Sequence, residues 1–163
     1  MLAVLLENAT MLDGIRALLA PRPWWINAIW LFCLYMTFAY LPFDLFWKPI
    51  ERDDEVWLGF AVHGVWAKAT EPIHWLIYGL GAYGFWKMRA WLWPWAAVYV
   101  AQIAIGMLVW SVRSPIAGGA WIGIALFVAF AALAVALWRA KGRFCAGPAA
   151  SPRARGAATK IDG

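Results

Sequence analysis

Long apolar stretches separated by short polar segments form the main pattern along the chain. Three of these stretches contain no charged residue: Trp24–Phe43, Trp91–Val112 and Ile116–Trp138, with 20, 22 and 23 residues. A helix of about 20 apolar residues crosses the hydrocarbon core of a bilayer. The pattern therefore predicts a membrane-spanning helix at each of these three places.

The residues after the first stretch are less uniform. We interpret residues 44–68 as an outer loop, within which Val56–Ala67 is apolar but only 12 residues long. A helix of that length is about 18 Å long, too short to span a bilayer. We therefore predict a short interfacial or re-entrant helix there, and a further span at about 69–88. The predicted fold is an all-α, four-transmembrane-helix bundle formed by residues 21–146.

The two ends of the chain differ from this bundle. In residues 1–20 most apolar side chains fall on one side of a helix, and Glu7, Asp13 and Arg16 fall on the other. This pattern predicts an N-terminal amphipathic helix that lies on the membrane surface. Residues 147–163 are rich in Ala, Pro, Gly and Arg, which predicts a flexible tail.

Composition agrees with a membrane protein. Hydrophobic residues make up 64% of the chain and charged residues 14%, whereas soluble domains average about 45–50% and about 25%. This composition argues against a soluble enzyme, and it excludes disorder outside the tail. Cys33 and Cys145 form no CxxC pair, which argues against a thiol–disulfide membrane enzyme.

The basic residues predict the orientation. With four spans, 10 of the 14 Lys and Arg residues lie on the side that holds both termini, and 4 lie on the other side. Loops rich in Lys and Arg stay in the cytoplasm, so both termini are predicted to be cytoplasmic. The net charge of +5 is thus explained by topology, and no nucleic-acid partner is expected. The excess of Arg over Lys points to a bacterial inner membrane.

Tryptophans mark the predicted membrane boundaries. The chain has 14 of them, and indole rings favour the headgroup level, where the N–H group stays hydrated. An aromatic cage for a quaternary ammonium ligand is the alternative. The predicted interface anchors are Trp24, Trp25, Trp75, Trp86, Trp91, Trp110, Trp121 and Trp138.

Small and polar residues within the spans predict helix contacts. Gly119 and Gly123 form a GxxxG motif, which Ala125 and Ala129 continue along the last span. Small residues let helix backbones approach closely, either within the bundle or against a partner. Gln102, midway along the third span, is predicted to make an interhelical hydrogen bond, with a ligand contact as the alternative.

The candidate reactive residues are His63, Glu71 and His74. Glu71 and His74 form an E-x-x-H motif on one helical face, but a di-iron bundle needs two such motifs and two further carboxylates. The two histidines are 11 residues apart, about 16 Å along a continuous helix, too far to hold one haem iron. We therefore predict structural roles, with no metal and no cofactor.

Three functional hypotheses follow. The three uncharged spans lack the ionisable group that ion-coupled transporters keep within the membrane. The favoured hypothesis is a non-catalytic accessory or scaffold subunit that packs in the bilayer against other membrane subunits or further copies of itself. The alternatives are a redox or metal enzyme subunit with an outer-face site at His63, Glu71 and His74, and a passive carrier of a small or lipid-like molecule.

Overall fold

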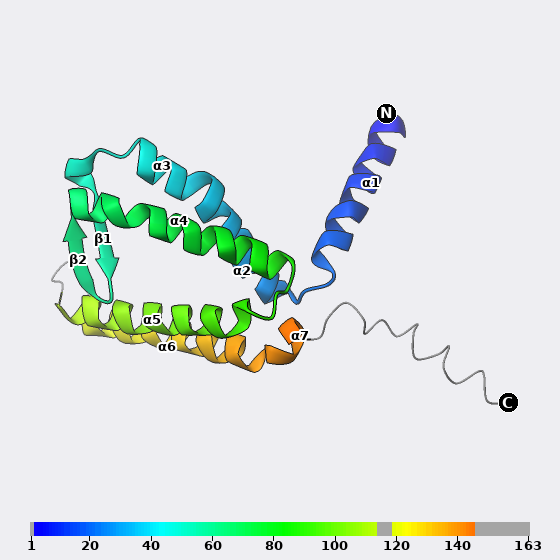
Figure 1. Cartoon of the computed structure of the whole chain (residues 1–163). Helices are drawn as coiled ribbons and strands as arrows, with labels where there is room; N and C mark the ends of the chain where they lie inside the picture. Colours follow the sequence, from blue (N-terminus) through cyan, green and yellow to red (C-terminus); the bar gives the residue numbers. More distant parts are fainter. Residues whose placement is uncertain (1, 114–118, 146–163) are drawn as a thin grey trace. The chain divides into compact units, whose positions relative to one another are not determined.

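The computed structural model describes residues 2–113 and 119–145, with side chains from residue 11 onward. The predicted tail 147–163 and the first residues of the predicted span 116–138 lie outside the described residues. The chain divides into two compact units. Unit 1 comprises Met1–Trp47 and Glu71–Trp86, and unit 2 comprises Lys48–Thr70 and Lys87–Gly163. Helices dominate both units (Figure 1).

Three helices are long and apolar enough to cross a membrane: Trp24–Phe46, Leu92–Arg113 and Ala120–Arg139. They coincide with most of the three uncharged stretches of the sequence, and the first continues three residues beyond the predicted span, past Asp44. A helix, α1 (Leu2–Leu19), is present at the N-terminus, and the first half of its predicted amphipathic face lies outside the residues whose side chains are described. α4 (Val65–Trp86) covers most of the predicted span at 69–88 and begins before it.

The first long helix of unit 1 contains a wide turn caused by proline. It consists of α2 (Trp24–Tyr35), the π-helical turn η1 (Met36–Tyr40) and α3 (Leu41–Phe46). Pro42 has no N–H group, and its ring would clash with the carbonyl four residues earlier in a regular α-helix. The N–H of Leu41 instead reaches back to the Met36 carbonyl. Neither Leu41 nor Pro42 therefore donates to the carbonyl oxygen of Thr37.

α4 supplies the donor that this turn lacks. The indole N–H of Trp75 donates to the Thr37 carbonyl at 2.8 Å. Farther along the same helix, a Cβ atom at Gly81 would lie 3.1 Å from the Cys33 sulfur. Higher numbers on α4 thus face lower numbers on α2, and the Glu71–Trp86 part of α4 lies antiparallel to the first long helix.

A buried arginine closes the other end of unit 1. Arg22, in the break between α1 and α2, is 6% exposed. Its guanidinium donates to Asn27 Oδ1 at 2.7 Å, to the Trp86 carbonyl at 2.8 Å and to the Leu18 carbonyl at 2.9 Å. Two of these bonds satisfy carbonyls at the last turns of α1 and α4, where helices lack internal donors, and the third binds a side chain in the first turn of α2. Arg22 therefore ties the start of α2 to the ends of two other helices.

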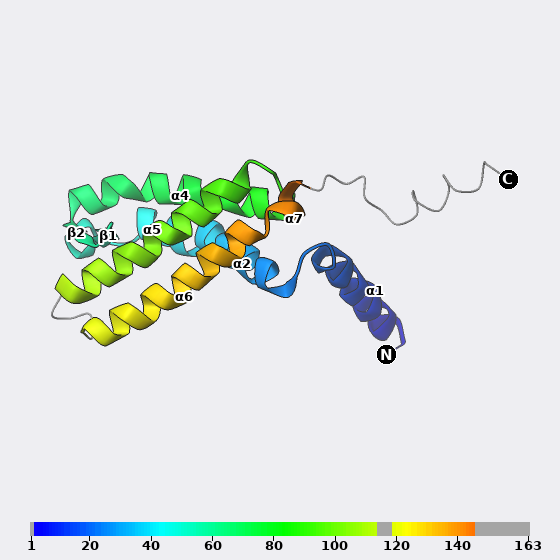
Figure 2. The ribbon, with the colours of Figure 1, turned by 90° about the horizontal axis from the view of Figure 1, so that it is seen from below.

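Unit 2 is built on a pair of antiparallel helices, α5 (Leu92–Arg113) and α6 (Ala120–Arg139), which lie side by side in Figures 1 and 2. At one end Gly123 is buried so close to α5 that a Cβ atom there would lie 2.5 Å from the Ser111 Cβ. At the other end the rings of Trp93 and Trp138 lie 4.7 Å apart. The short helix α7 (Lys141–Cys145) follows, with Phe144 buried.

The prediction of a helix at Val56–Ala67 is wrong. Most of this segment belongs to an antiparallel hairpin of β1 (Asp54–Trp57) and β2 (Phe60–His63), preceded by the 3-10 turn η2 (Ile50–Arg52). Leu58 and Gly59 connect the strands, and both have positive φ angles, 53° and 88°. Positive φ at both central residues is the geometry of a tight type I′ hairpin turn, which a helix cannot accommodate.

The hairpin turn packs against α5 within unit 2. A Cβ atom at Gly59 would lie 2.5 Å from the Val109 Cβ and 3.1 Å from the Gly106 carbonyl oxygen. The positive φ and the close approach both require glycine at position 59. Directly after the turn, the Arg113 guanidinium lies over the Phe60 ring, 4.9 Å from its centroid. α5 therefore holds both the hairpin turn and α6.

Candidate functional site

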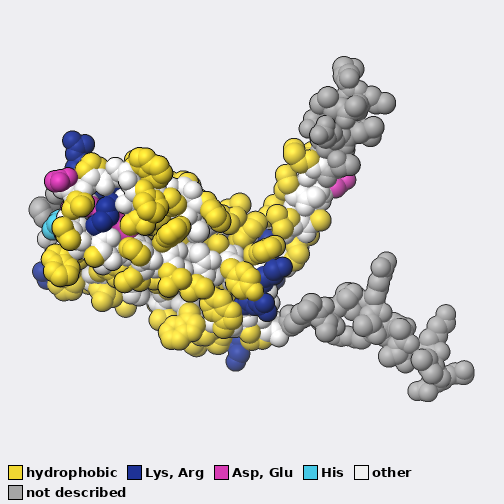
Figure 3. Space-filling view, turned by 45° about the horizontal axis from the view of Figure 1, so that its top comes forward, with side chains coloured by type: hydrophobic (Ala, Val, Ile, Leu, Met, Phe, Trp, Pro, Cys, Tyr) yellow, Lys and Arg dark blue, Asp and Glu magenta, His cyan; other side chains and the backbone are white. Residues whose placement is uncertain are grey.

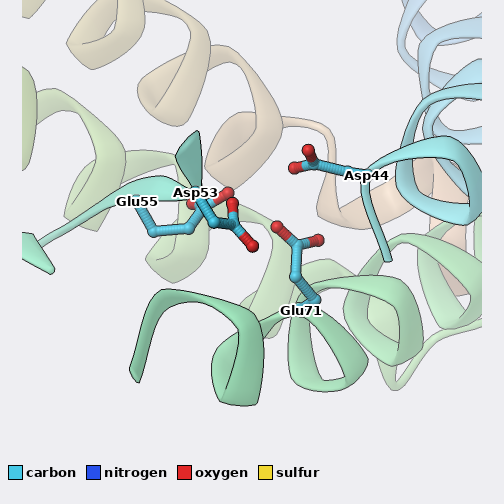
Figure 4. A group of neighbouring side chains, drawn as sticks. All are labelled: Asp44, Asp53, Glu55 and Glu71. Atoms are coloured by element: carbon cyan, nitrogen blue, oxygen red, sulfur yellow. The ribbon is translucent and has the colours of Figure 1, made fainter. Parts of the chain in front are cut away.

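Two carboxylates of unit 1 face each other from different helices. Asp44 on α3 is 2% exposed and Glu71 on α4 is fully buried, and one carboxylate oxygen of each lies within 4.8 Å of the other (Figure 4). Buried carboxylates at such short range are stabilised by a positive charge close to both. Both residues also interact with other groups. Asp44 belongs to one of the three candidate membrane-crossing helices.

A second acidic pair, in unit 2, is neutralised by lysines. Asp53 is fully buried, and its two carboxylate oxygens bind Lys48 Nζ at 2.8 Å and Lys68 Nζ at 3.0 Å. Glu55 offers an oxygen within 4.8 Å of Asp53 (Figure 4). The two acids and two lysines balance in charge. Lys68 belongs to the first turns of α4, so this cluster holds the segment before the hairpin to the helix that follows it.

The lysines control the ionisation of Asp53. Burial alone would raise the pKa of the Asp53 carboxyl, but the hydrogen bonds and charges of Lys48 and Lys68 lower the pKa below its ordinary value of 3.8. The carboxylate is therefore charged throughout the neutral range. Its role is that of a fixed anion between two cations, which stabilises the fold of this segment.

The three predicted reactive residues lie in different surroundings. His63, on β2 of unit 2, is exposed, and its Nδ1 lies 2.6 Å from an Asp54 oxygen across the hairpin. Glu71 and His74 lie on α4 in unit 1, where Glu71 faces Asp44. His74 is half-buried and interacts with other groups.

The residues predicted to pack helices divide into two groups. Gly123 is buried against Ser111, whereas a Cβ atom at Gly119 would meet nothing within 4 Å. Ala125 and Ala129 are exposed. Gln102 on α5 is half-buried. The contact between α5 and α6 thus uses the Gly123 side of α6, and the predicted alanines lie elsewhere on that helix.

The predicted tryptophan anchors lie at or beside helix ends, with Trp75 on α4 as the exception. Trp24 opens α2 and is 82% exposed, and Trp121 near the start of α6 is 84% exposed. Trp75, Trp86, Trp91 and Trp138 are also exposed, and Trp25 and Trp110 are half-buried. Hydrophobic side chains cover most of the face that Figure 3 shows.

Each unit carries a shallow apolar groove. In unit 1 a groove of about 440 Å³ lies beside the π-helical turn and is lined by Thr37, Pro72, Trp75, Leu76, Gly79 and Leu80. The Thr37 hydroxyl donates to the Cys33 carbonyl at 2.7 Å, so it is bonded within its own helix. In unit 2 a groove of about 260 Å³ lies between α5 and α6 and has Arg139 in its lining.

The sequence reasoning missed Asp44, Asp53 and Arg22 as organising residues. Asp44 and Asp53 fall within the predicted outer loop 44–68, and Arg22 precedes the first predicted span. Pro42 was a sequence signal that Asp44 lies on a helix. Proline is tolerated in the first turn of a helical segment, and a segment that starts at Pro42 continues through Asp44. Burial of Asp53 and Arg22 depends on distant partners, which local pattern does not reveal.

Comparisons with protein families, with curated proteins and with solved structures find no match for this chain.

Proposed function

We propose that the chain is a membrane-embedded accessory or scaffold subunit that packs against another membrane protein through the outer side of α6. One observation carries this proposal: α6 leaves a row of small residues exposed. Ala125, Ala129 and Ala132 are all exposed, and at 100° per residue they fall within an arc of about 60°. Small residues in such a row allow the backbone of another helix to approach closely.

The position of this row supports contact with a partner. On the helical wheel it lies opposite Gly123 and Ala134, which are buried on the side that meets α5. α6 therefore has one side occupied by its neighbour in unit 2, and the opposite side carries the alanine row, flanked by the exposed Trp121, Ile122 and Val128. Lipid tails need no small residues, whereas a packed helix does.

The proposal places four spans in a bacterial inner membrane, with both termini in the cytoplasm. α4 has 22 residues, about 33 Å of helix, and its part from Trp75 to Trp86 contacts Thr37 and Cys33 of the first candidate span and then Arg22, just before that span. A helix that lies along a membrane-crossing helix over this length crosses the same layer. An even number of spans leaves the termini on one side, and the distribution of Lys and Arg assigns that side to the cytoplasm.

Cysteine labelling in intact cells tests this topology. Both native cysteines are replaced by alanine, and a single cysteine is placed at Asp54 or Arg155. A membrane-impermeant maleimide should label position 54 and spare position 155. Labelling of position 155 from outside would require an odd number of spans and would contradict the proposed topology.

Native purification tests the scaffold role. The wild-type chain, extracted in mild detergent, should co-purify with another membrane protein in a fixed ratio by mass spectrometry. Ala129→Leu should lower recovery of that partner about tenfold, because bulk in the row prevents close approach. Ala120→Leu is the matched control, an exposed alanine on the same helix outside the row.

Two results would contradict the scaffold role. One is equal partner recovery from both variants. The other is near-stoichiometric metal in the purified wild type that disappears in Glu71→Gln, which would favour the metal-enzyme alternative. Recovery of additional copies of this chain alone would identify the partner as the protein itself.

A further inference from the structure

The groove between α5 and α6 in unit 2 has the chemistry of a phospholipid site. Small side chains on both helices, Ala97 and Ala101 on α5 and Ala134 on α6, leave a groove of about 260 Å³. Val135 and Trp138 continue the apolar lining, and the exposed Arg139 lies at the end of it. The groove thus offers an apolar surface and a cation to one elongated ligand.

Further cations gather at the same end of the helix pair. The Lys141 ammonium lies 5.1 Å from the centroid of the Trp93 ring. The Trp93 ring packs on Trp138, and its indole N–H donates to the Trp138 carbonyl at 2.8 Å. This bond holds the Trp93 indole against Trp138, which lines the groove. Arg143 follows Lys141 by two residues on α7 and is exposed.

The charge at this end has one sign. From Lys87 to Cys145 the sequence contains no Asp or Glu. Five of the six Lys and Arg residues in this range lie before α5 or from the end of α6 onward, at the end where α5 begins and α6 finishes: Lys87, Arg89, Arg139, Lys141 and Arg143. An anion is therefore the complement of this end. Basic sites between membrane helices favour anionic lipid headgroups for this reason.

We infer that this groove binds one anionic phospholipid, with an acyl chain along Ala97, Ala101 and Ala134 and the phosphate between Arg139 and Lys141. The inference rests on the membrane insertion given under Proposed function, and it is independent of the partner at the alanine row. A free phosphate would use only the cations, whereas a phospholipid uses the apolar groove as well. The two indoles sit at the depth where headgroup and chain meet.

Native mass spectrometry of the full chain tests this site. The protein is reconstituted in phosphatidylcholine vesicles that contain a minor fraction of phosphatidylglycerol, then extracted in mild detergent. The wild type should retain one phosphatidylglycerol. Arg139→Gln combined with Lys141→Gln should lower retention about thirtyfold, since each surface cation contributes about a factor of five to anionic lipid binding.

Three further variants separate the causes. Arg139→Lys with Lys141→Arg keeps both charges and should retain the lipid. Arg52→Gln removes an exposed cation in η2 and should also retain it. Ala101→Leu fills the groove but leaves both cations, and should lower retention of phosphatidylglycerol. Thermal unfolding of each variant in detergent shows whether it is folded.

The inference is overturned if phosphatidylcholine is retained as well as phosphatidylglycerol, or if the doubly neutralised variant keeps its lipid. Displacement of phosphatidylglycerol by inorganic phosphate alone would assign the site to a free anion instead. Loss of lipid with normal partner recovery would separate this site from the scaffold role, and loss of the partner with normal lipid retention would do the reverse.

Discussion

Units 1 and 2 hold their helices together in different ways. In unit 1 the contacts depend on polar groups that reach across to backbone carbonyls: Arg22 to Trp86 and Trp75 to Thr37. In unit 2 the contacts depend on glycines, which have no side chain and allow close approach, as at Gly123 against Ser111 and Gly59 against Val109. Helices in lipid gain no hydrophobic energy from association, so hydrogen bonds and close packing are what remain. Unit 1 relies mainly on the hydrogen bonds and unit 2 mainly on the close packing, although Gly81 also approaches Cys33 in unit 1 and Trp93 donates to the Trp138 carbonyl in unit 2.

The difference follows from the helices themselves. The first long helix contains a proline-induced π-helical turn, which leaves the Thr37 carbonyl without a backbone donor. A side-chain donor is then required, and Trp75 provides it. α5 and α6 have no such turn in their described residues, so their backbones are satisfied internally and can approach closely wherever glycine or alanine occurs.

The largest effect is expected in unit 1, from Arg22→Met. The substitution removes three hydrogen bonds and leaves the Leu18 and Trp86 carbonyls without this donor, at a cost of about 3 kcal/mol or more in the free energy of unfolding. Burial lowers the pKa of Arg22, but an arginine stays charged at neutral pH. The readout is the modification rate of Cys33, which is 5% exposed in unit 1, relative to the exposed Cys145.

Arg16→Met is the control for Arg22. Arg16 pairs with Asp13 at 3.6 Å on the surface, with its side chain 81% exposed, and such pairs contribute little to stability. Its Cys33 rate should match the wild type. Equal rates for Arg22→Met and Arg16→Met would show that unit 1 does not depend on its buried arginine.

The next effect belongs to unit 2. Gly123→Ala places a Cβ atom 2.5 Å from the Ser111 Cβ, and overpacking of this kind costs about 1–3 kcal/mol. Thermal unfolding in detergent measures the loss. Gly142→Ala adds the same methyl group where nothing lies within 4 Å, so its midpoint should not fall. A Gly123→Ala midpoint equal to that of Gly142→Ala would contradict close packing of α5 on α6.

The cluster of Asp53, Lys48 and Lys68 differs from both helix contacts because its contribution to stability depends on pH. The pKa of Asp53 is lowered in the folded protein, so its contribution to stability is complete above the ordinary value of 3.8. The contribution is lost as the pH falls through the lower, folded-state pKa. Asp53→Asn should therefore flatten the acid side of the stability–pH curve. Asp54→Asn, at an exposed acid, is the control variant. An unchanged acid limb in Asp53→Asn would contradict this account.

The smallest effect is expected from Trp75→Phe. This variant keeps an aromatic ring and removes the N–H donor to Thr37, so it should cost about 0.6–1.7 kcal/mol, the range for interhelical hydrogen bonds in membranes. Trp121→Phe, at a ring that is 84% exposed, should cost less. Hydrogen exchange at η1 should accelerate only in Trp75→Phe, and no acceleration would mean that the π-helical turn is stable without this bond.

The positions of the three long helices were predictable from the sequence, whereas the structure of the segment after the first helix was not. Uninterrupted apolar runs of 20 or more residues have few structural alternatives, which is why the three long helices lie where the sequence predicted them. Val56–Ala67 was ambiguous because a short apolar run suits a helix or a hairpin. Gly59 and Gly64 were the available signals, since each glycine inside a helix costs about 1 kcal/mol.

The candidate site was predictable only in part. Glu71 was recognised from its local motif with His74, but its buried neighbour Asp44 lies 27 positions earlier in the sequence, on another helix. The alanines at 125 and 129 were recognised as small, but the side of α6 that meets α5 depends on Ser111. Local spacing identifies a helix face, and only the fold determines which neighbour it meets.

The most direct test of the central claim is site-specific photo-crosslinking in native membranes. A photoreactive side chain is placed at Ala129, in the exposed alanine row of α6, or at Leu137, which is fully buried in unit 2. The scaffold proposal expects a product with the mass of a second polypeptide from position 129 and none from position 137. Reaction of position 129 with lipid alone would contradict the proposal that this side of α6 packs against a partner.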